Sequence, residues 1–355
     1  MMQQPAAPRL TIAIPTLNRA YCLAKAIDSA LGQVSADVEV IVSNNGSRDE
    51  THELLDKYRD PRLRIFHRES TIPACQHGNF LIGLARGEFF LGLSDDDFIE
   101  PDFAARVIEA FDRSPSLSFV YTGCWIHFAD VRVPAKIGPA VESGTDFVAG
   151  FLGGNRDPCW CACVTRTDDL RRIGPIPNGM LFGDMFYWTR LAFRGDVGCV
   201  AAPVSNYIVL GSGRDNLSTK ASVIEWATEV RMLVEHMAAD YWQATNDPEA
   251  AARLRRDLED FVARSTADQF IWNAIRGVPR LGLLRAVAPA LTFLLPGRGQ
   301  AGLWLRIFGA IFGRRSVLRR TVLMAAAKKA RDVLADNLTV QQSAPGVLSQ
   351  RLRDE

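Results

Sequence analysis

The sequence lacks an uninterrupted apolar run of the roughly 20 residues that a membrane-spanning helix needs. Its most apolar stretches, near the C-terminus, are broken by Arg285, Arg298, Arg306 and Arg314. Residues 1–8 have neither a basic start nor an apolar segment, so no secretory signal is recognisable. The seven cysteines are odd in number and few for 355 residues, which argues against a disulfide scaffold. These absences predict a protein of the reducing cytoplasm.

Acidic residues are missing from one long segment. Between Ile271 and Arg331 there are twelve Lys and Arg residues and no Asp or Glu, although the whole chain has a net charge of only +1. The remainder holds 29 basic and 40 acidic residues, so the chain is not a uniformly basic protein and we expect no nucleic-acid partner. Aromatic residues stand beside cations in this segment, for example over 303–315, as in helices that lie among lipid headgroups. We therefore predict a peripheral location on the inner face of the cell membrane. Packing on the rest of the chain and a homodimer interface are the alternatives.

From residue 10 to residue 121 the chain alternates strand and helix patterns. Helical spacing predicts a helix that Asn18 caps, a second over residues 73–86 and a third that Pro101 opens. Strands with little alternation, separated by helices, indicate an α/β fold with a mainly parallel sheet that helices cover on both faces. The predicted strands are Leu10–Ile14, Val38–Val42, Leu63–His67, Glu88–Leu93 and Leu117–Tyr121.

The second half of the chain has weaker patterns. Cys159–Val164 reads as a strand on which Cys159, Cys161 and Cys163 all face one side, and core packing explains them better than a metal site does. A helix is expected over Phe182–Phe193 and a last strand over Val200–Val209. Helical patterns follow, so we expect two regions, 1–218 and a helical C-terminal region over 219–355.

Three polar, turn-forming loops follow predicted strands. They are Pro15–Arg19, Ser43–Ser47 and Ser94–Asp97. Ligands of open α/β sheets bind beyond the carboxyl ends of the strands. We therefore expect the three loops to form one pocket.

Three consecutive carboxylates, Asp95, Asp96 and Asp97, follow a strand that is predicted to be buried. Like charges at this spacing raise one another's pKa, and a divalent cation removes the repulsion. Oxygen ligands suit Mg²⁺ or Mn²⁺, which also bind substrate phosphates. The acids thus predict a metal–diphosphate site. A solvated turn that caps the next helix fits the acids equally well when they are taken alone.

Several motifs in a fixed order resemble a known family. They are Ile14–Arg19, Val40–Ser47, Gly87–Asp97 with Pro101 and Asp102, then Ile173–Gly174, Gly183–Asp184, Arg190–Ala192, Gly195 and Tyr207. Together they are similar to glycosyltransferase family 2, over roughly residues 9–218. The resemblance implies a GT-A fold, a Rossmann-like and mainly parallel sheet flanked by helices, as the catalytic domain. It also implies an inverting transfer of a sugar, expected to be a hexose, from a nucleotide-sugar donor to a saccharide or lipid-linked saccharide, in cell-surface polysaccharide or glycoconjugate synthesis.

The resemblance assigns roles to particular residues. The donor-binding residues that it implies are Pro15, Thr16 and Asn18 at the nucleoside, Asn45 at the base and Asp95 near the ribose. Asp96 would bind Mn²⁺ or Mg²⁺ with support from Asp97. Asp184 matches the general base, which removes the proton of the acceptor hydroxyl as it attacks. A helix-capping role is the alternative for Asp184.

The chain departs from the family pattern in places. No His follows Tyr207, and Gly78 stands where an Arg is frequent. Arg214 or Asn216 are candidates to replace the missing His. Asn45 stands where an Asp is usual, which leaves the base open. A nucleotidyltransferase on a similar sheet and a non-catalytic membrane-bound scaffold are the rival functions.

Overall fold

A computed structural model describes residues 7–34, 37–128, 131–180 and 183–210 of the chain. It also describes part of the following region, namely residues 229, 232–233, 235–242, 247–249, 254, 257–258 and 261. The basic segment 271–331 and the candidates Arg214 and Asn216 lie outside the described residues.

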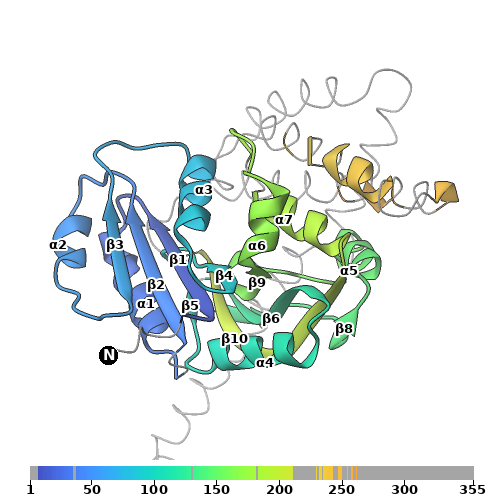
Figure 1. Cartoon of the computed structure of the whole chain (residues 1–355), viewed down its shortest axis with the longest axis horizontal. Helices are drawn as coiled ribbons and strands as arrows, with labels where there is room; N and C mark the ends of the chain where they lie inside the picture. Colours follow the sequence, from blue (N-terminus) through green and yellow to red (C-terminus); the bar gives the residue numbers. More distant parts are fainter. Residues whose placement is uncertain are drawn as a thin grey trace, which may run out of the picture.

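The strands form one mixed sheet in the order β3-β2-β1-β4-β9-β6-β10-β5, with β7 paired to β6 and β8 to β10 (Figure 1). Pairing is parallel among β1, β2, β3 and β4 and between β6 and β10, whereas β9 runs antiparallel to both of its neighbours. The strands are β1 (Leu10–Thr16), β2 (Val38–Asn44), β3 (Leu63–His67), β4 (Phe89–Gly92), β5 (Phe98–Ile99), β6 (Leu117–Phe128), β7 (Val131–Pro134), β8 (Val141–Glu142), β9 (Cys163–Arg166) and β10 (Asp196–Leu210).

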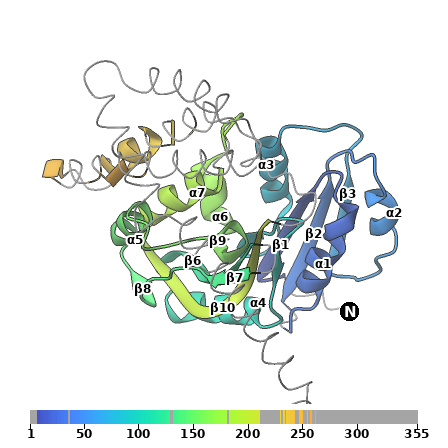
Figure 2. The same ribbon diagram turned by 180° about the vertical axis from the view of Figure 1, so that it is seen from behind.

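Helices cover both faces of the sheet, as the sequence predicts (Figures 1 and 2). The helices are α1 (Ala20–Leu31), α2 (Thr51–Leu55), α3 (Ala74–Leu84), α4 (Phe103–Arg113), α5 (Gly144–Leu152), α6 (Thr167–Ile173) and α7 (Gly183–Ala192), with a 3₁₀ turn η1 (Trp160–Ala162). Leu10, Ile12 and Ile14 of β1 join a core with α1 and α4, while Ala13 joins a second core with α3, α5, α6 and α7. The period of two along β1 thus supplies apolar side chains to both cores.

Residues beyond 228 pack on the α5 and α7 side of the second core. Leu233, Met237, Leu254 and Leu258 are buried there. The carboxylate of Asp240 lies 3.0 Å from the guanidinium of Arg190 on α7. No helix among the described residues is long and apolar enough to span a bilayer. The boundary at residue 218 stays a prediction.

Strand β1 extends past its predicted end at Ile14 and includes Pro15 and Thr16. Pro15 lacks an N–H group, which usually excludes it from the middle of a sheet. Its nitrogen points toward β4, because Ala13 and Thr16 accept hydrogen bonds from Leu93 and Asn45 on opposite sides of β1. The pairing of β1 with β4 ends at Ala13, so no hydrogen bond is lost at Pro15.

Asn18 does not cap α1, contrary to the sequence prediction. Arg19 holds the N-cap position, and the side chain of Asp49 accepts a hydrogen bond from the backbone N–H of Ala20 at 3.0 Å. The cap therefore comes from a residue 29 positions away in the sequence. Only the tertiary structure brings that residue to the start of the helix.

The predicted strand Cys159–Val164 is wrong in its first half. Residues 160–162 form η1, and the indole ring of Trp160 lies so close to Gly92 that a β-carbon there would be 2.1 Å from it. The cysteines do not share a face, because Cys159 and Cys161 join the first core and Cys163 the second. All three thiols are free and buried, so their predicted packing role is confirmed.

Candidate active site

Strands β2, β1 and β4 are neighbours, and the three loops that follow them lie at the same edge of the sheet. The backbone N–H of Asn45 donates to the carbonyl of Thr16 at 2.9 Å, and that of Leu93 donates to the carbonyl of Ala13 at 2.9 Å. The parallel register therefore brings together the three segments predicted to form the pocket, although Pro15 and Thr16 still belong to β1 and Ser43 and Asn44 to β2. This edge is where ligands of such sheets bind.

Asn18 joins the first loop to the second. Its backbone N–H donates to the hydroxyl of Ser47 at 2.8 Å, and its side-chain oxygen accepts from the N–H of Arg48 at 2.7 Å. Its φ angle of 54° lies in the left-handed region, which asparagine tolerates better than most residues. Beside it, the hydroxyl of Thr16 is buried and has no hydrogen-bond partner in the described part of the chain. A buried hydroxyl of this kind is available to a ligand.

Asn45 is held rigidly between two loops. Its amide nitrogen donates to the carbonyl of Ile72 at 2.9 Å, and its amide oxygen accepts from the N–H of the same residue at 3.0 Å. An amide has one further hydrogen and one further lone pair for a ligand. The hydroxyl of Ser43 lies 2.7 Å from Nε2 of His77. Burial, and secondarily the charge of Arg68, lower the pKa of His77 to about 4, so this ring packs as a neutral group.

The acidic loop is shielded from solvent and faces a cation. Asp95 and Asp96 are each only 7% exposed. The guanidinium of Arg19 lies 2.9 Å from a carboxylate oxygen of Asp96 and 3.3 Å from one of Asp95. No role was assigned to Arg19 from the sequence, although it closes the first motif. Its positive charge could have indicated a role, because Arg19 ends the first loop and three acids end the third.

Asp97 is the most deeply buried of the three acids. One of its oxygens accepts a hydrogen bond from the N–H of Ile208 on β10 at 2.8 Å, and the other is buried with no hydrogen-bond partner in the described ranges. Burial, followed by the charge of Asp96, raises the pKa of Asp97 well above its usual range. Ionisation of Asp97 is therefore unfavourable in this loop, and a bound cation would favour it by offsetting the repulsion from Asp96.

Asp184 lies in the first turn of α7, as a helix-capping role would also place it. It is half-buried, and its carboxylate accepts a hydrogen bond from the N–H of Met185 at 2.8 Å. Burial raises its pKa to about 6. Burial also raises the pKa of Tyr207, and the charges of Asp97 and Asp184 act in the same direction, so the phenol lies within electrostatic reach of both acids. Asp97 and Asp184 thus both act on the phenol of Tyr207.

Arg68 is a second cation that no motif indicated. Its backbone N–H donates to the carbonyl of Asn44 at 3.0 Å, and its guanidinium lies 5.3 Å from the ring centre of Phe80 on α3. Its Nε is buried without a hydrogen-bond partner among the residues described. Helix α3 also contains Gly78, where the family often has an arginine. A cation therefore reaches this helix from the preceding loop.

A known protein family matches the part of the chain that contains these loops. Residues 11–132 match the sequence profile of glycosyl transferase family 2, and they include β2, β4, all of β1 except Leu10, and all three loops. The predicted fold and family are confirmed: the chain contains a glycosyl transferase family 2 domain with a GT-A-like fold.

Curated relatives share this N-terminal part. The chain is 34% identical over 117 residues to a chondroitin synthase of Pasteurella multocida, which covers 32% of this chain and 12% of the synthase. It is 35% identical over 107 residues to the succinoglycan biosynthesis protein ExoO of Rhizobium meliloti, which covers 30% of this chain and 31% of ExoO. The chain thus matches a minor part of the length of these relatives.

Similarity in three dimensions extends further. Residues 1–349 of S. aureus TarS, solved in complex with UDP-GlcNAc, superpose with a TM-score of 0.63 at 15% identity. The superposition covers 86% of this chain and 89% of that structure. At this identity the likeness concerns the fold alone.

Proposed function

We propose that this chain transfers a sugar from a nucleotide-sugar donor to a saccharide or lipid-linked saccharide in polysaccharide or glycoconjugate synthesis. The observation that carries the proposal is the meeting of three loops, with Thr16, Asn45 and the acidic residues 95–97, at one edge of a family 2 sheet. The similarity to a chondroitin synthase and to the succinoglycan biosynthesis protein ExoO supports polymer synthesis as the context. The complex of TarS with UDP-GlcNAc supports a nucleotide-sugar donor.

The acidic loop fits a divalent cation. Its donors are carboxylate oxygens, which Mg²⁺ and Mn²⁺ prefer, and Asp97 has a buried oxygen without a partner among the described residues. Asp96 would hold the ion with support from Asp97, and Asp95 would lie near the ribose. When bound, the ion neutralises the diphosphate as it leaves. Arg19 touches Asp95 and Asp96 in this structure, so it would place a second positive charge near the departing diphosphate.

Asp184 is the proposed general base. An acceptor hydroxyl is a weak nucleophile and loses its proton as it attacks the anomeric carbon. A carboxylate with a pKa of about 6 is ionised at neutral pH and is more basic than an ordinary aspartate. Attack from the side opposite the leaving diphosphate inverts the anomeric centre. Thr16, Pro15 and Asn18 at the nucleoside and Asn45 at the base complete the proposed donor site.

A nucleotide panel tests the proposal. The melting temperature is measured with UDP, GDP, CDP and dTDP, each with and without Mn²⁺, and the cognate nucleotide is expected to raise it most when Mn²⁺ is present. Incubation with the corresponding nucleotide sugar should then release nucleoside diphosphate. Release of pyrophosphate would instead identify a nucleotidyltransferase. Failure of all four nucleotides to bind would favour a non-catalytic scaffold.

We further propose that the basic segment 271–331 binds the cytoplasmic face of the cell membrane. Its twelve cations and no acids support attraction to anionic lipid, worth about 1 kcal/mol for each cation near the surface. The full chain should sediment with vesicles that contain phosphatidylglycerol and not with pure phosphatidylcholine vesicles. Added salt should weaken the binding, since screening shortens the range of the attraction. Equal binding to both vesicles would contradict the proposal.

A further inference from the structure

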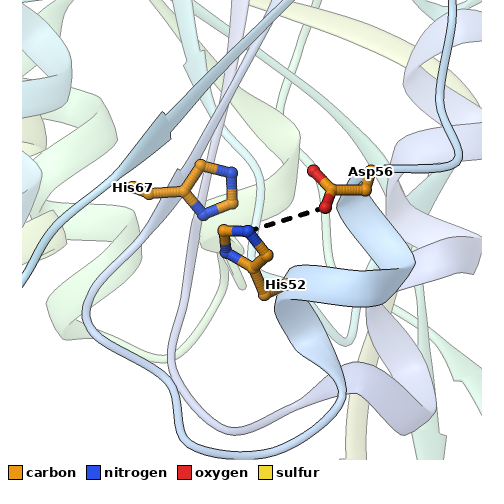
Figure 3. Close-up of side chains that lie close together, drawn as sticks. All are labelled: His52, Asp56 and His67. Atoms are coloured by element: carbon orange, nitrogen blue, oxygen red, sulfur yellow. Dashed lines mark ion pairs between the residues drawn. The ribbon is translucent and has the colours of Figure 1, made fainter.

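Two imidazoles and a carboxylate lie together on the surface beside the sheet (Figure 3). His52 and Asp56 come from α2 and the residue that follows it, and His67 is the last residue of β3. One ligand atom from each residue lies within 4.8 Å of the others. Nε2 of His52 is 3.5 Å from the carboxylate of Asp56, and the ring centres of His52 and His67 are 4.2 Å apart.

The fold brings these residues together from two segments. His52 and Asp56 are four positions apart, so they share one face of a helical turn. Asn44 at the end of β2 pairs with His67 at the end of β3, and the chain that leaves β2 leads directly into α2. The side chains of His52 and Asp56 are 58% and 64% exposed, so an ion can reach them from solvent.

The chemistry of the cluster differs from that of the acidic loop. Two imidazole nitrogens and one carboxylate oxygen form a ligand set that suits Zn²⁺, Cu²⁺ or Ni²⁺, with remaining positions open to water. Mg²⁺ and Mn²⁺ prefer the oxygen donors of residues 95–97. The two groups of side chains therefore select different ions.

We propose that His52, Asp56 and His67 form a second metal site, which binds one transition-metal ion of the Zn²⁺ class and links α2 to β3. Helix α2 follows the segment that holds Asn45, and β3 pairs with β2 up to Asn44, the residue before Asn45. His67 is followed directly by residues 68–72, where Arg68 donates to the carbonyl of Asn44 and Ile72 bonds to both amide atoms of Asn45. The ion braces the loop at the end of β2 from outside the donor site.

Zinc titration of the full chain tests the site. The protein carries no affinity tag, its thiols are kept reduced, and excess Mg²⁺ occupies the acidic loop. Calorimetry should find one Zn²⁺ per chain, and binding should weaken by more than about tenfold in His52→Ala, Asp56→Asn and His67→Ala separately. His236→Ala is the matched control, because His236 is also exposed but packs on Phe186, and it should bind Zn²⁺ as the wild type does.

Cobalt gives an independent readout of the ligands. Co²⁺ bound at this site should show visible d–d bands without the near-ultraviolet charge-transfer band of a thiolate ligand. A thiolate band would place the ion on cysteine and overturn the proposal. Absence of Zn²⁺ binding to the wild type would also overturn the proposal. Unchanged binding in His67→Ala would do the same, because the ion would then not link β3 to α2. Circular dichroism of each variant checks that it is folded.

Discussion

Replacement of Asp184 by asparagine is expected to slow sugar transfer by about 10²–10⁴-fold, the range that general-base catalysis contributes. Asparagine keeps the shape of the side chain and the oxygen that accepts the hydrogen bond from Met185, but it cannot take a proton from the acceptor hydroxyl. The melting shift with the cognate nucleotide and Mn²⁺ should stay as in the wild type. The measurement is the single-turnover rate of donor consumption with a saturating acceptor.

Two controls separate this effect from a loss of structure. Asp168→Asn changes an exposed acid in the first turn of α6 and should leave the rate unchanged. Burial raises the pKa of Asp184 from 3.8 to about 6, so the ionised group destabilises the folded state above about pH 6 and this effect vanishes below about pH 3.8. Asp184→Asn should therefore melt at the same or a higher temperature at pH 8. Full activity of Asp184→Asn would refute the base assignment.

The pH dependence of the same reaction is a second test of Asp184 as the general base. The wild-type kcat/KM should fall about tenfold per unit as the pH drops below about 6, because the protonated carboxyl group of Asp184 cannot act as a base. Above that pH the rate should level off until another group titrates. The residual activity of Asp184→Asn should lack this acidic limb.

Replacement of Asp96 by asparagine is expected to lower metal-dependent transfer by about 10²–10³-fold, the loss seen when one charge-stabilising group is removed. The amide has no charge with which to hold Mn²⁺ or Mg²⁺, and the guanidinium of Arg19 then has only Asp95 as an acidic partner among its described ion pairs. The concentration of Mn²⁺ needed for half-maximal rate should rise. The measurement is a Mn²⁺ titration of transfer after removal of metals with EDTA.

The matched control for Asp96 is Asp102→Asn. Asp102 lies just before α4, pairs with Arg106 and has a side chain that is 43% exposed. This variant should respond to Mn²⁺ as the wild type does. If Asp96→Asn also kept the wild-type Mn²⁺ response, the metal would have to be assigned to other residues.

Much of the first half of the fold could be predicted from the sequence because its signals are local. Apolar β-branched runs that end in turn residues locate β1 to β4 to within a few residues, and β3 has the predicted bounds. Each of the three loops follows a predicted strand of a parallel sheet. This was enough to predict that they lie together, because parallel neighbouring strands have their carboxyl ends at one edge. The second half was less predictable. The alternating cysteines give a strand-like pattern, whereas residues 160–162 form a 3₁₀ turn in which Trp160 packs on Gly92.

The sequence by itself determined the α/β class, the family and the identity of the acids, because these depend on periodicity and on motifs of adjacent residues. Only the tertiary structure decided which groups face those acids. Arg19 against Asp95 and Asp96, and His67 against His52, are contacts between loops and elements that are separate in the chain. The raised pKa of Asp184 likewise depends on its burial in the folded chain. Such contacts leave no local pattern, because a side chain's partner across the fold is set by strand order and register rather than by its neighbours in sequence.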